Sequence, residues 1–217
     1  MSASHGSAPG PEKVEMVRSA RYALALVVNV VLPVAAYRLA FGHFGQAGAL
    51  TASAVPLIVW MGIDLLRYQH FDALSALALS AVVMSLLVSV LAPAHWAIAT
   101  EDPLVSGFTG ALFLLSLLLD RPLVFYLARS TMSREKQGNE SQFDELWRTR
   151  PPIVRAIRVM TAVWGIGLIA ENAIRFWLIY HADDGDRLST YVRYGVWGGL
   201  TVWTILYRRL YIKRLRE

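Results

Sequence analysis

Apolar residues in this chain fall in long stretches with few polar positions rather than at alternating positions. Six stretches of about 20 residues are apolar on all sides: residues 22–41, 47–66, 73–91, 104–128, 156–180 and 190–207. A helix needs about 20 apolar residues to cross the hydrocarbon core of a bilayer, whereas the strands of a membrane barrel would alternate in polarity. The pattern therefore predicts an all-α, polytopic membrane protein with six transmembrane helices.

The polar segments divide the chain into three parts. Residues 1–21 are rich in Ser, Ala, Gly and Pro and predict a mobile N-terminal tail. Residues 22–207 form the predicted transmembrane domain, which includes a cytoplasmic loop at 130–155, and residues 208–217 form a basic tail. Within the loop, Phe143, Leu146 and Trp147 have helical apolar spacing. They predict a short amphipathic helix on the inner membrane surface, with an ordinary solvated loop as the alternative.

The charged residues orient the six stretches. Most of the 21 lysines and arginines fall in the N-terminal tail, in the loop before the fifth stretch and in the C-terminal tail. The opposite loops contain acids: Glu101, Asp102, Asp183, Asp184 and Asp186. Because basic loops stay on the cytoplasmic side, both termini are predicted to be cytoplasmic. The formal charge of +5 then indicates anionic lipids of the cytoplasmic leaflet as partners, rather than nucleic acid.

Known catalytic signatures are missing from the sequence. The chain has no cysteine, and it contains no nucleophile elbow, phosphate-binding loop, zinc-protease motif or dinucleotide fingerprint. His181 precedes three acids in an outer loop, but their spacing matches neither a calcium loop nor a zinc site. We therefore expect no enzymatic activity, no cofactor and no metal.

The first and fourth stretches share a local pattern. Pro33 is followed four residues later by Tyr37, and Pro122 is followed four residues later by Tyr126. This spacing places a kink and a hydroxyl on one helical face. Because each half would contain three helices, the pattern is compatible with a 3+3 inverted repeat of the kind that many transporters have.

Several short motifs resemble a known family. Leu32 to Arg38, Arg121 to Leu127, and a later segment with Trp164, Glu171 and Asn172 resemble motifs of bacterial intracellular septation protein A. They also resemble a related group of six-helix inner-membrane proteins. The resemblance implies a non-enzymatic role in envelope maintenance or division, with envelope or division proteins as partners. The cytoplasmic loop is longer here, and Glu171 with Arg175 has no counterpart in that family.

Three polar residues interrupt the fifth stretch near its middle. Glu171 and Asn172 are adjacent, and Arg175 follows Glu171 by one helical turn. Charged groups at this depth are costly, and Glu before Arg at i, i+4 is the favourable order for an ion pair. Two interpretations remain open: a structural pair that orients the helix inward, or a carboxylate that responds to protons or substrate.

Other polar residues lie nearer the ends of the stretches. Asp64 and Arg67 end the second stretch, and Asp120 and Arg121 lie in the inner part of the fourth. They can form a bridge between helices, from Asp64 to Arg121 or from Asp120 to Arg67, or they can extend individually to water. Asn29 in the first stretch is expected to form an interhelical hydrogen bond.

Small residues mark the expected helix contacts. Gly195 and Gly199 in the sixth stretch are four residues apart, as in close-contact helix pairs, and Gly165 and Gly167 lie in the fifth. We expect them to pack within one molecule, with a homodimer as the second interpretation. The function expected first is an interaction protein. The alternative is a small transporter or a proton-conducting protein that uses Glu171 and Arg175.

Overall fold

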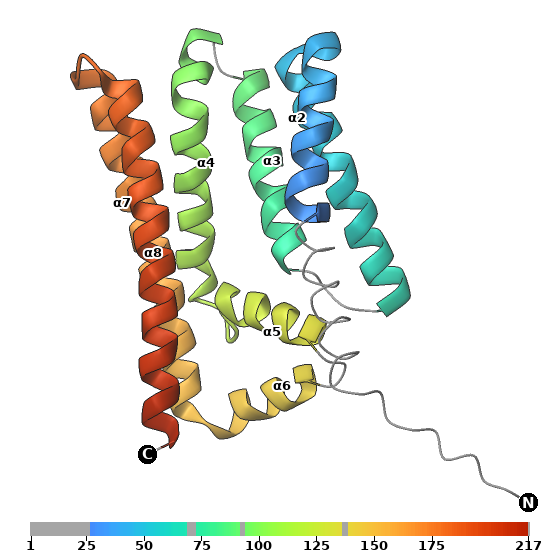
Figure 1. The fold of residues 1–217 in the computed structure, drawn as a ribbon, viewed down its shortest axis with the longest axis vertical. Helices are drawn as coiled ribbons and strands as arrows, with labels where there is room; N and C mark the ends of the chain where they lie inside the picture. Colours follow the sequence, from blue (N-terminus) through green and yellow to red (C-terminus); the bar gives the residue numbers. More distant parts are fainter. Residues whose placement is uncertain (1–26, 69–72, 92–93, 136–138, 217) are drawn as a thin grey trace, which may run out of the picture.

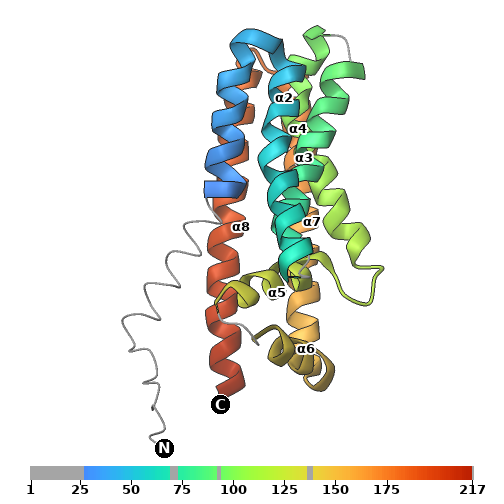
Figure 2. The same ribbon diagram turned by 90° about the vertical axis from the view of Figure 1, so that its right-hand side faces the viewer.

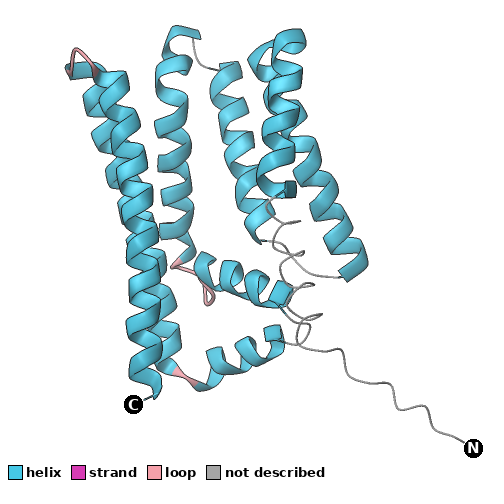
Figure 3. Cartoon of the chain, viewed as in Figure 1, coloured by secondary structure: helices cyan, strands magenta, loops and turns pink. Residues whose placement is uncertain are grey.

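The computed structural model describes residues 27–68, 73–91, 94–135 and 139–216, and nearly all of them are helical (Figure 3). The elements are η1 (Val27–Val31), α2 (Leu32–Tyr68), α3 (Ala73–Leu91), α4 (Ala94–Ser116), α5 (Leu123–Glu135), α6 (Asn139–Thr149), α7 (Pro151–His181) and α8 (Gly185–Arg216). No strand occurs within these described ranges, so the predicted all-α class is confirmed. The predicted N-terminal tail, residues 1–21, lies outside the described residues.

Helix α2 is a hairpin of two helical arms rather than one rod. Gly45 has non-helical dihedrals, φ 67° and ψ −169°, in a region that residues with a side chain rarely adopt. The chain reverses there, at the upper end of the molecule in Figure 1. The two arms therefore correspond to the first and second predicted stretches, and glycine is the residue type that permits the tight reversal.

The long helices stand side by side in an open row. The extensive contacts run from α2 to α3, from α3 to α4, from α4 to α7 and from α7 to α8. Successive members of the row run in opposite directions, so that η1 begins and α8 ends toward the same side (Figures 1 and 2). Among the described helices, α7 is the only one with which α8 makes extensive contacts. The row is thus not closed into a cylinder by an α2–α8 contact.

Helices α5 and α6 lie across the lower end of this row (Figure 1). The prediction of one span over residues 104–128 is wrong, because α4 begins at Ala94 and ends at Ser116, and α5 is a separate helix. Pro122 provides the physical reason: proline lacks an N–H and disfavours helical geometry in the residue before it. The Ser116 hydroxyl then accepts a hydrogen bond of 2.9 Å from the N–H of Leu123, the first residue of α5.

The predicted amphipathic helix in the cytoplasmic loop is present as α6, which ends just before Pro151. Its apolar residues pack on protein rather than standing free. The ring of Phe143 is stacked 5.2 Å from that of Phe125 in α5, and the Trp147 ring lies edge-on to Phe125 at 4.7 Å. Helix α8 continues to Arg216, so residues 208–216 of the predicted basic tail extend the last helix.

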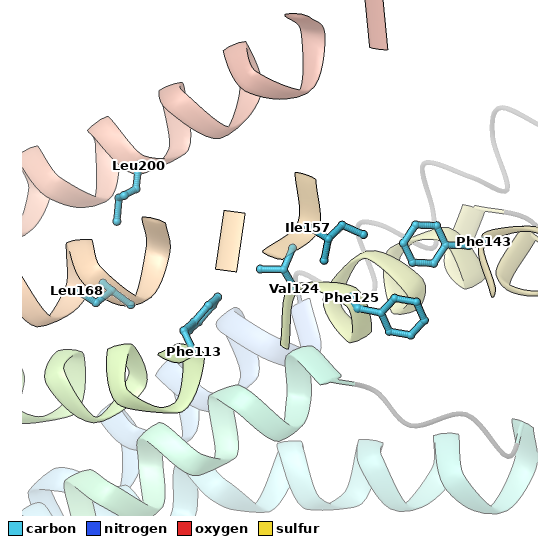
Figure 4. Packing of buried hydrophobic residues seen from close by; sticks show 7 residues of the cluster. All are labelled: Phe113, Val124, Phe125, Phe143, Ile157, Leu168 and Leu200. Atoms are coloured by element: carbon cyan, nitrogen blue, oxygen red, sulfur yellow. The ribbon is translucent and has the colours of Figure 1, made fainter. Parts of the chain in front are cut away.

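A hydrophobic cluster joins α5 and α6 to the row of long helices. Figure 4 shows its buried members: Phe113, Val124, Phe125, Phe143, Ile157, Leu168 and Leu200. They come from α4, α5, α6, α7 and α8. Phe125 has no exposed surface, so the two crossing helices are anchored through the centre of this cluster.

The outer faces of the row are strongly apolar. Large hydrophobic side chains are exposed along it, among them Leu39, Phe44, Leu66, Leu91 and Leu118. Three segments are long and apolar enough to cross a membrane: Val27–Ile63, which contains the α2 hairpin, Ala73–Leu91 and Pro151–His181. Apolar surface of this extent is unfavourable in water and suits a lipid environment, so the fold is consistent with a membrane protein.

Candidate functional site: a polar layer across the helices

The predicted pair on α7 is formed and completely enclosed. Arg175 Nη1 lies 2.9 Å from Glu171 Oε1, one helical turn apart. The second carboxylate oxygen, Glu171 Oε2, accepts a hydrogen bond from the Ser106 hydroxyl on α4. Glu171 is 0% exposed and Arg175 is 3% exposed. Both oxygens of a buried carboxylate are therefore bonded, which is the condition under which a buried charge is tolerated.

Arg175 extends this pair into a wider network. Its Nε donates to the Ser189 hydroxyl on α8 at 2.9 Å, and its Nη2 lies 3.5 Å from Asp102 Oδ2 on α4. Arg193 of α8 binds the same Asp102 oxygen through Nη1. A single guanidinium thus connects α4, α7 and α8, and Asp102 forms ion pairs with two arginines.

Glu101, the neighbour of Asp102, connects α4 to the other side of the row. Its two carboxylate oxygens accept hydrogen bonds from Gln46 on α2 and from Ser85 on α3. We call this set, from Gln46 and Ser85 through Glu101, Asp102 and Ser106 to Glu171, Arg175, Ser189 and Arg193, the polar layer. Two adjacent acids of α4 therefore join helices on both of its flanks.

The sequence analysis missed the central members of the polar layer. Glu101 and Asp102 were expected in an outer loop, but both lie inside α4, because that helix begins at Ala94. The sequence feature that could have indicated this site is the adjacent Pro103. In the structure Pro103 is fully buried inside α4. A buried proline inside a helix leaves one carbonyl without its intrahelical partner and marks a site of special packing.

Asn172, predicted beside Glu171, also binds α4. Its Nδ2 donates to the backbone oxygen of Pro103. Gly107 makes this contact sterically feasible, since a Cβ there would lie 2.7 Å from Asn172 Cγ. The predicted trio Glu171, Asn172 and Arg175 is thus one set of contacts from α7 toward α4.

Asn29 forms the expected link between helices, since its side-chain oxygen accepts a 2.7 Å hydrogen bond from the Ser75 hydroxyl on α3. Arg121 pairs with Asp144 of α6 at 3.5 Å, and its guanidinium lies 4.9 Å from the centre of the Phe125 ring. Asp120 lies in the exposed turn after α4. The side chains of Asp64 and Arg67, with which the two bridges were expected, lie outside the described part.

The two Pro–Tyr motifs occupy different settings. Pro33 is the second residue of α2, where it follows the π-helical turn η1, and the Tyr37 ring lies 5.6 Å from Phe41 on the same arm. Pro122 precedes α5, and the Tyr126 ring contacts Phe125 at 5.4 Å. Pro122 does not kink a continuous span as predicted, because it stands at the start of a separate helix, where its missing N–H is tolerated. Pro33 lies in an unbroken helical run from η1 into α2, so the kink expected there stays a prediction.

The glycines divide into two groups. Gly110 of α4 and Gly165 of α7 face each other, and a Cβ on Gly110 would lie 3.0 Å from the Gly165 oxygen. A Cβ on Gly167 would meet Leu200 of α8 at 2.9 Å. By contrast, a Cβ on Gly195 or Gly199 would meet nothing within 4 Å among the residues that the structure describes. The expected internal packing is therefore confirmed for α7 and wrong for the glycine pair of α8.

The chemistry open to the centre of the polar layer follows from the burial of Glu171 and Arg175. Glu171 has no surface from which to exchange a proton with water, and both of its oxygens are already bonded. Within the described ranges, no group of three or more His, Cys, Asp or Glu side chains is arranged to hold a metal ion. Comparisons of the chain with protein-family models, with curated proteins and with solved structures found no match. The arrangement is that of an internal connection between helices.

Proposed function

We propose that the chain is a six-span protein of the bacterial inner membrane that acts through contacts with other envelope proteins or with lipids, without catalysis. Its six spans are the two arms of α2 together with α3, α4, α7 and α8. Helix α3, with 19 residues, is about 28 Å long, close to the roughly 30 Å of a bilayer core. The alternating directions of these segments support termini on one side of the membrane, and the basic residues near both ends favour the cytoplasmic side.

The enclosed Glu171–Arg175 pair is the observation on which the non-catalytic role rests. A transporter or a proton conductor needs a route by which water or a solute reaches its intramembrane charge. Glu171 instead has no exposed surface and bonds to two neighbouring side chains. An enclosed pair with hydrogen-bond partners for both carboxylate oxygens supports a structural role for these charges, and it leaves the surface of the protein as its functional part.

The surface of α8 supports an interaction role. Gly195, Gly198 and Gly199 are open, and the exposed aromatic residues Tyr191 and Tyr194 lie on the same helix. The motifs similar to septation protein A favour envelope or division proteins as partners. A second copy of the chain is the other candidate for contact with α8.

Single-cysteine labelling tests the orientation directly, because the natural chain has no cysteine. Asp184→Cys, in the turn between α7 and α8, should react in intact spheroplasts with a maleimide that cannot cross membranes. Asp120→Cys, in the turn after α4, should react only after permeabilisation. Labelling of both positions from the same side would refute the proposed topology.

Flux and interaction measurements test the role. Purified protein in liposomes should show no proton flux above that of empty vesicles, and Glu171→Gln should behave in the same way. Crosslinking in intact membranes should capture an envelope protein or a second copy, and deletion of the gene should alter cell shape or envelope integrity. A proton flux that Glu171→Gln abolishes would favour the transporter instead.

A further inference from the structure

A cavity that is widely open to the outside lies where the turn after α4, α6 and the beginning of α7 meet. Its volume is about 660 Å³, within the usual range for ligand sites. Its walls are Leu117, Trp147, Arg148, Pro151, Val154, Arg155, Arg158, Val159 and Ala162. The α7 members recur every three or four residues, so one face of that helix forms the long wall.

Three arginines and no acid line this cavity. Arg148 comes from α6, and Arg155 and Arg158 come from α7. Among the described residues, no carboxylate lies within ion-pairing distance of any of the three. Arg158 donates to the backbone oxygens of Leu117, Leu119 and Asp120 at 3.1–3.3 Å, which fixes its guanidinium but does not neutralise it. The cavity therefore has a concentrated, uncompensated positive charge.

The rest of the wall is apolar and extends along α7 in one direction. Val159 and Ala162 follow the arginines toward the middle of the helix, and Leu117, in the turn after α4, also lines the cavity. From Pro151 to Ala162 the helix rises about 16 Å. Trp147, at the charged end, is a residue type that favours the boundary between lipid and water. The cavity thus has a cationic end and an apolar end, as an amphiphile with an anionic headgroup requires.

We propose that this cavity binds one anionic phospholipid of the cytoplasmic leaflet. Arg148, Arg155 and Arg158 contact its phosphate, and Val159, Ala162 and Leu117 contact the first part of an acyl chain. The proposal rests on the membrane orientation proposed above, in which α5 and α6 lie at the inner boundary. Basic pockets beside transmembrane helices on the cytoplasmic side are known to hold anionic headgroups.

Native mass spectrometry of the purified full-length protein in detergent tests this site without depending on orientation. Phosphatidylglycerol and phosphatidylcholine are titrated separately, and the first bound lipid is quantified. We expect phosphatidylglycerol to bind more tightly. Arg148→Gln together with Arg155→Gln should weaken its binding about 25-fold, at roughly fivefold for each arginine near an anionic lipid. Arg158 is left intact, because it also holds the end of α4.

Two matched variants separate this site from general attraction. Arg208→Gln with Arg209→Gln removes the same charge from the exposed end of α8, and it should leave the first lipid bound as in the wild type. Ala162→Trp fills the apolar end, so it should weaken phosphatidylglycerol but not glycerol 3-phosphate. Equal loss in the two arginine pairs, no preference over phosphatidylcholine, or equal affinity for glycerol 3-phosphate or an acidic peptide would overturn the proposal. Cysteine labelling reports the orientation independently.

Discussion

The arginines near the two ends of α7 differ in burial and in their partners. Arg175, near the upper end, is buried and contacts Glu171, Asp102 and Ser189. Arg155, near the lower end, is exposed, and no carboxylate among the described residues pairs with it. A charge that leaves water needs compensation from the protein, whereas an exposed charge remains available to an outside partner. The same residue type therefore holds the fold together at one end and is free for recognition at the other.

Removing the buried acid Glu171 should cause the largest loss of stability. Glu171→Leu leaves Arg175 enclosed without its closest partner, and we expect a loss of about 3–5 kcal/mol in the free energy of unfolding. Unfolding in mixed detergent–SDS micelles measures it. The double variant Glu171→Leu, Arg175→Met removes both charges and should be more stable than the single variant. If Glu171→Leu lowers the free energy of unfolding by less than about 1 kcal/mol, the buried pair does not stabilise the fold as proposed.

The glycine contacts should give the next largest effect. Gly110→Val inserts a side chain where a Cβ would already lie 2.9 Å from Leu168 Cβ. We expect overpacking to cost about 1–3 kcal/mol in the same unfolding assay. Gly198→Val on α8 is the matched control, since a Cβ there has nothing within 4 Å, and it should change stability by less than about 0.5 kcal/mol. Equal losses would mean that both faces are packed.

Asp102 lies between the two extremes of burial. It is 64% exposed although it contacts both Arg175 and Arg193. Solvent screens such pairs, so Asp102→Asn should destabilise the protein by at most about 1 kcal/mol. A thermal melt in detergent, with Asp186→Asn as an exposed acid outside the polar layer, provides the measurement. A loss as large as that of Glu171→Leu would show that Asp102 is as essential to Arg175 as Glu171 is.

The smallest effect on stability is expected at the lower end of α7. Arg155→Gln removes an exposed charge without a carboxylate partner among the described residues, so the free energy of unfolding should stay within about 0.5 kcal/mol of the wild type. Arg175→Gln, the same substitution at the buried end, should destabilise strongly. If the two variants lose similar stability in the same thermal melt, the two ends of α7 do not differ as proposed.

Sequence patterns predicted the helices better than the breaks between them. The apolar stretch at residues 73–91 coincides with α3, and the spacing of Phe143 and Trp147 predicted α6. The break before Pro122 was not predicted, because an apolar segment on both sides of a proline is compatible with either a kinked helix or two helices. Contacts between distant helices decide which of the two forms.

The candidate site was predicted only in part for a related reason. Glu171 and Arg175 are one helical turn apart, and their pairing follows from helix geometry. Their partners Asp102 and Ser106 are far away in the sequence, and nothing in the local pattern of α4 indicates which neighbour they meet. The open glycines of α8 illustrate the same limit, since the spacing of Gly195 and Gly199 does not reveal whether a helix lies against them.

The sequence by itself determined the apolar character of the chain, its helical class and the charge asymmetry of its segments, because these depend on composition and on local periodicity. Only the tertiary structure decided that α5 and α6 cross the end of the row, that Glu101 and Asp102 join its two flanks, and that three arginines surround one cavity. These features depend on which surfaces of distant helices meet, and that choice is made by packing and by the pairing of buried charge.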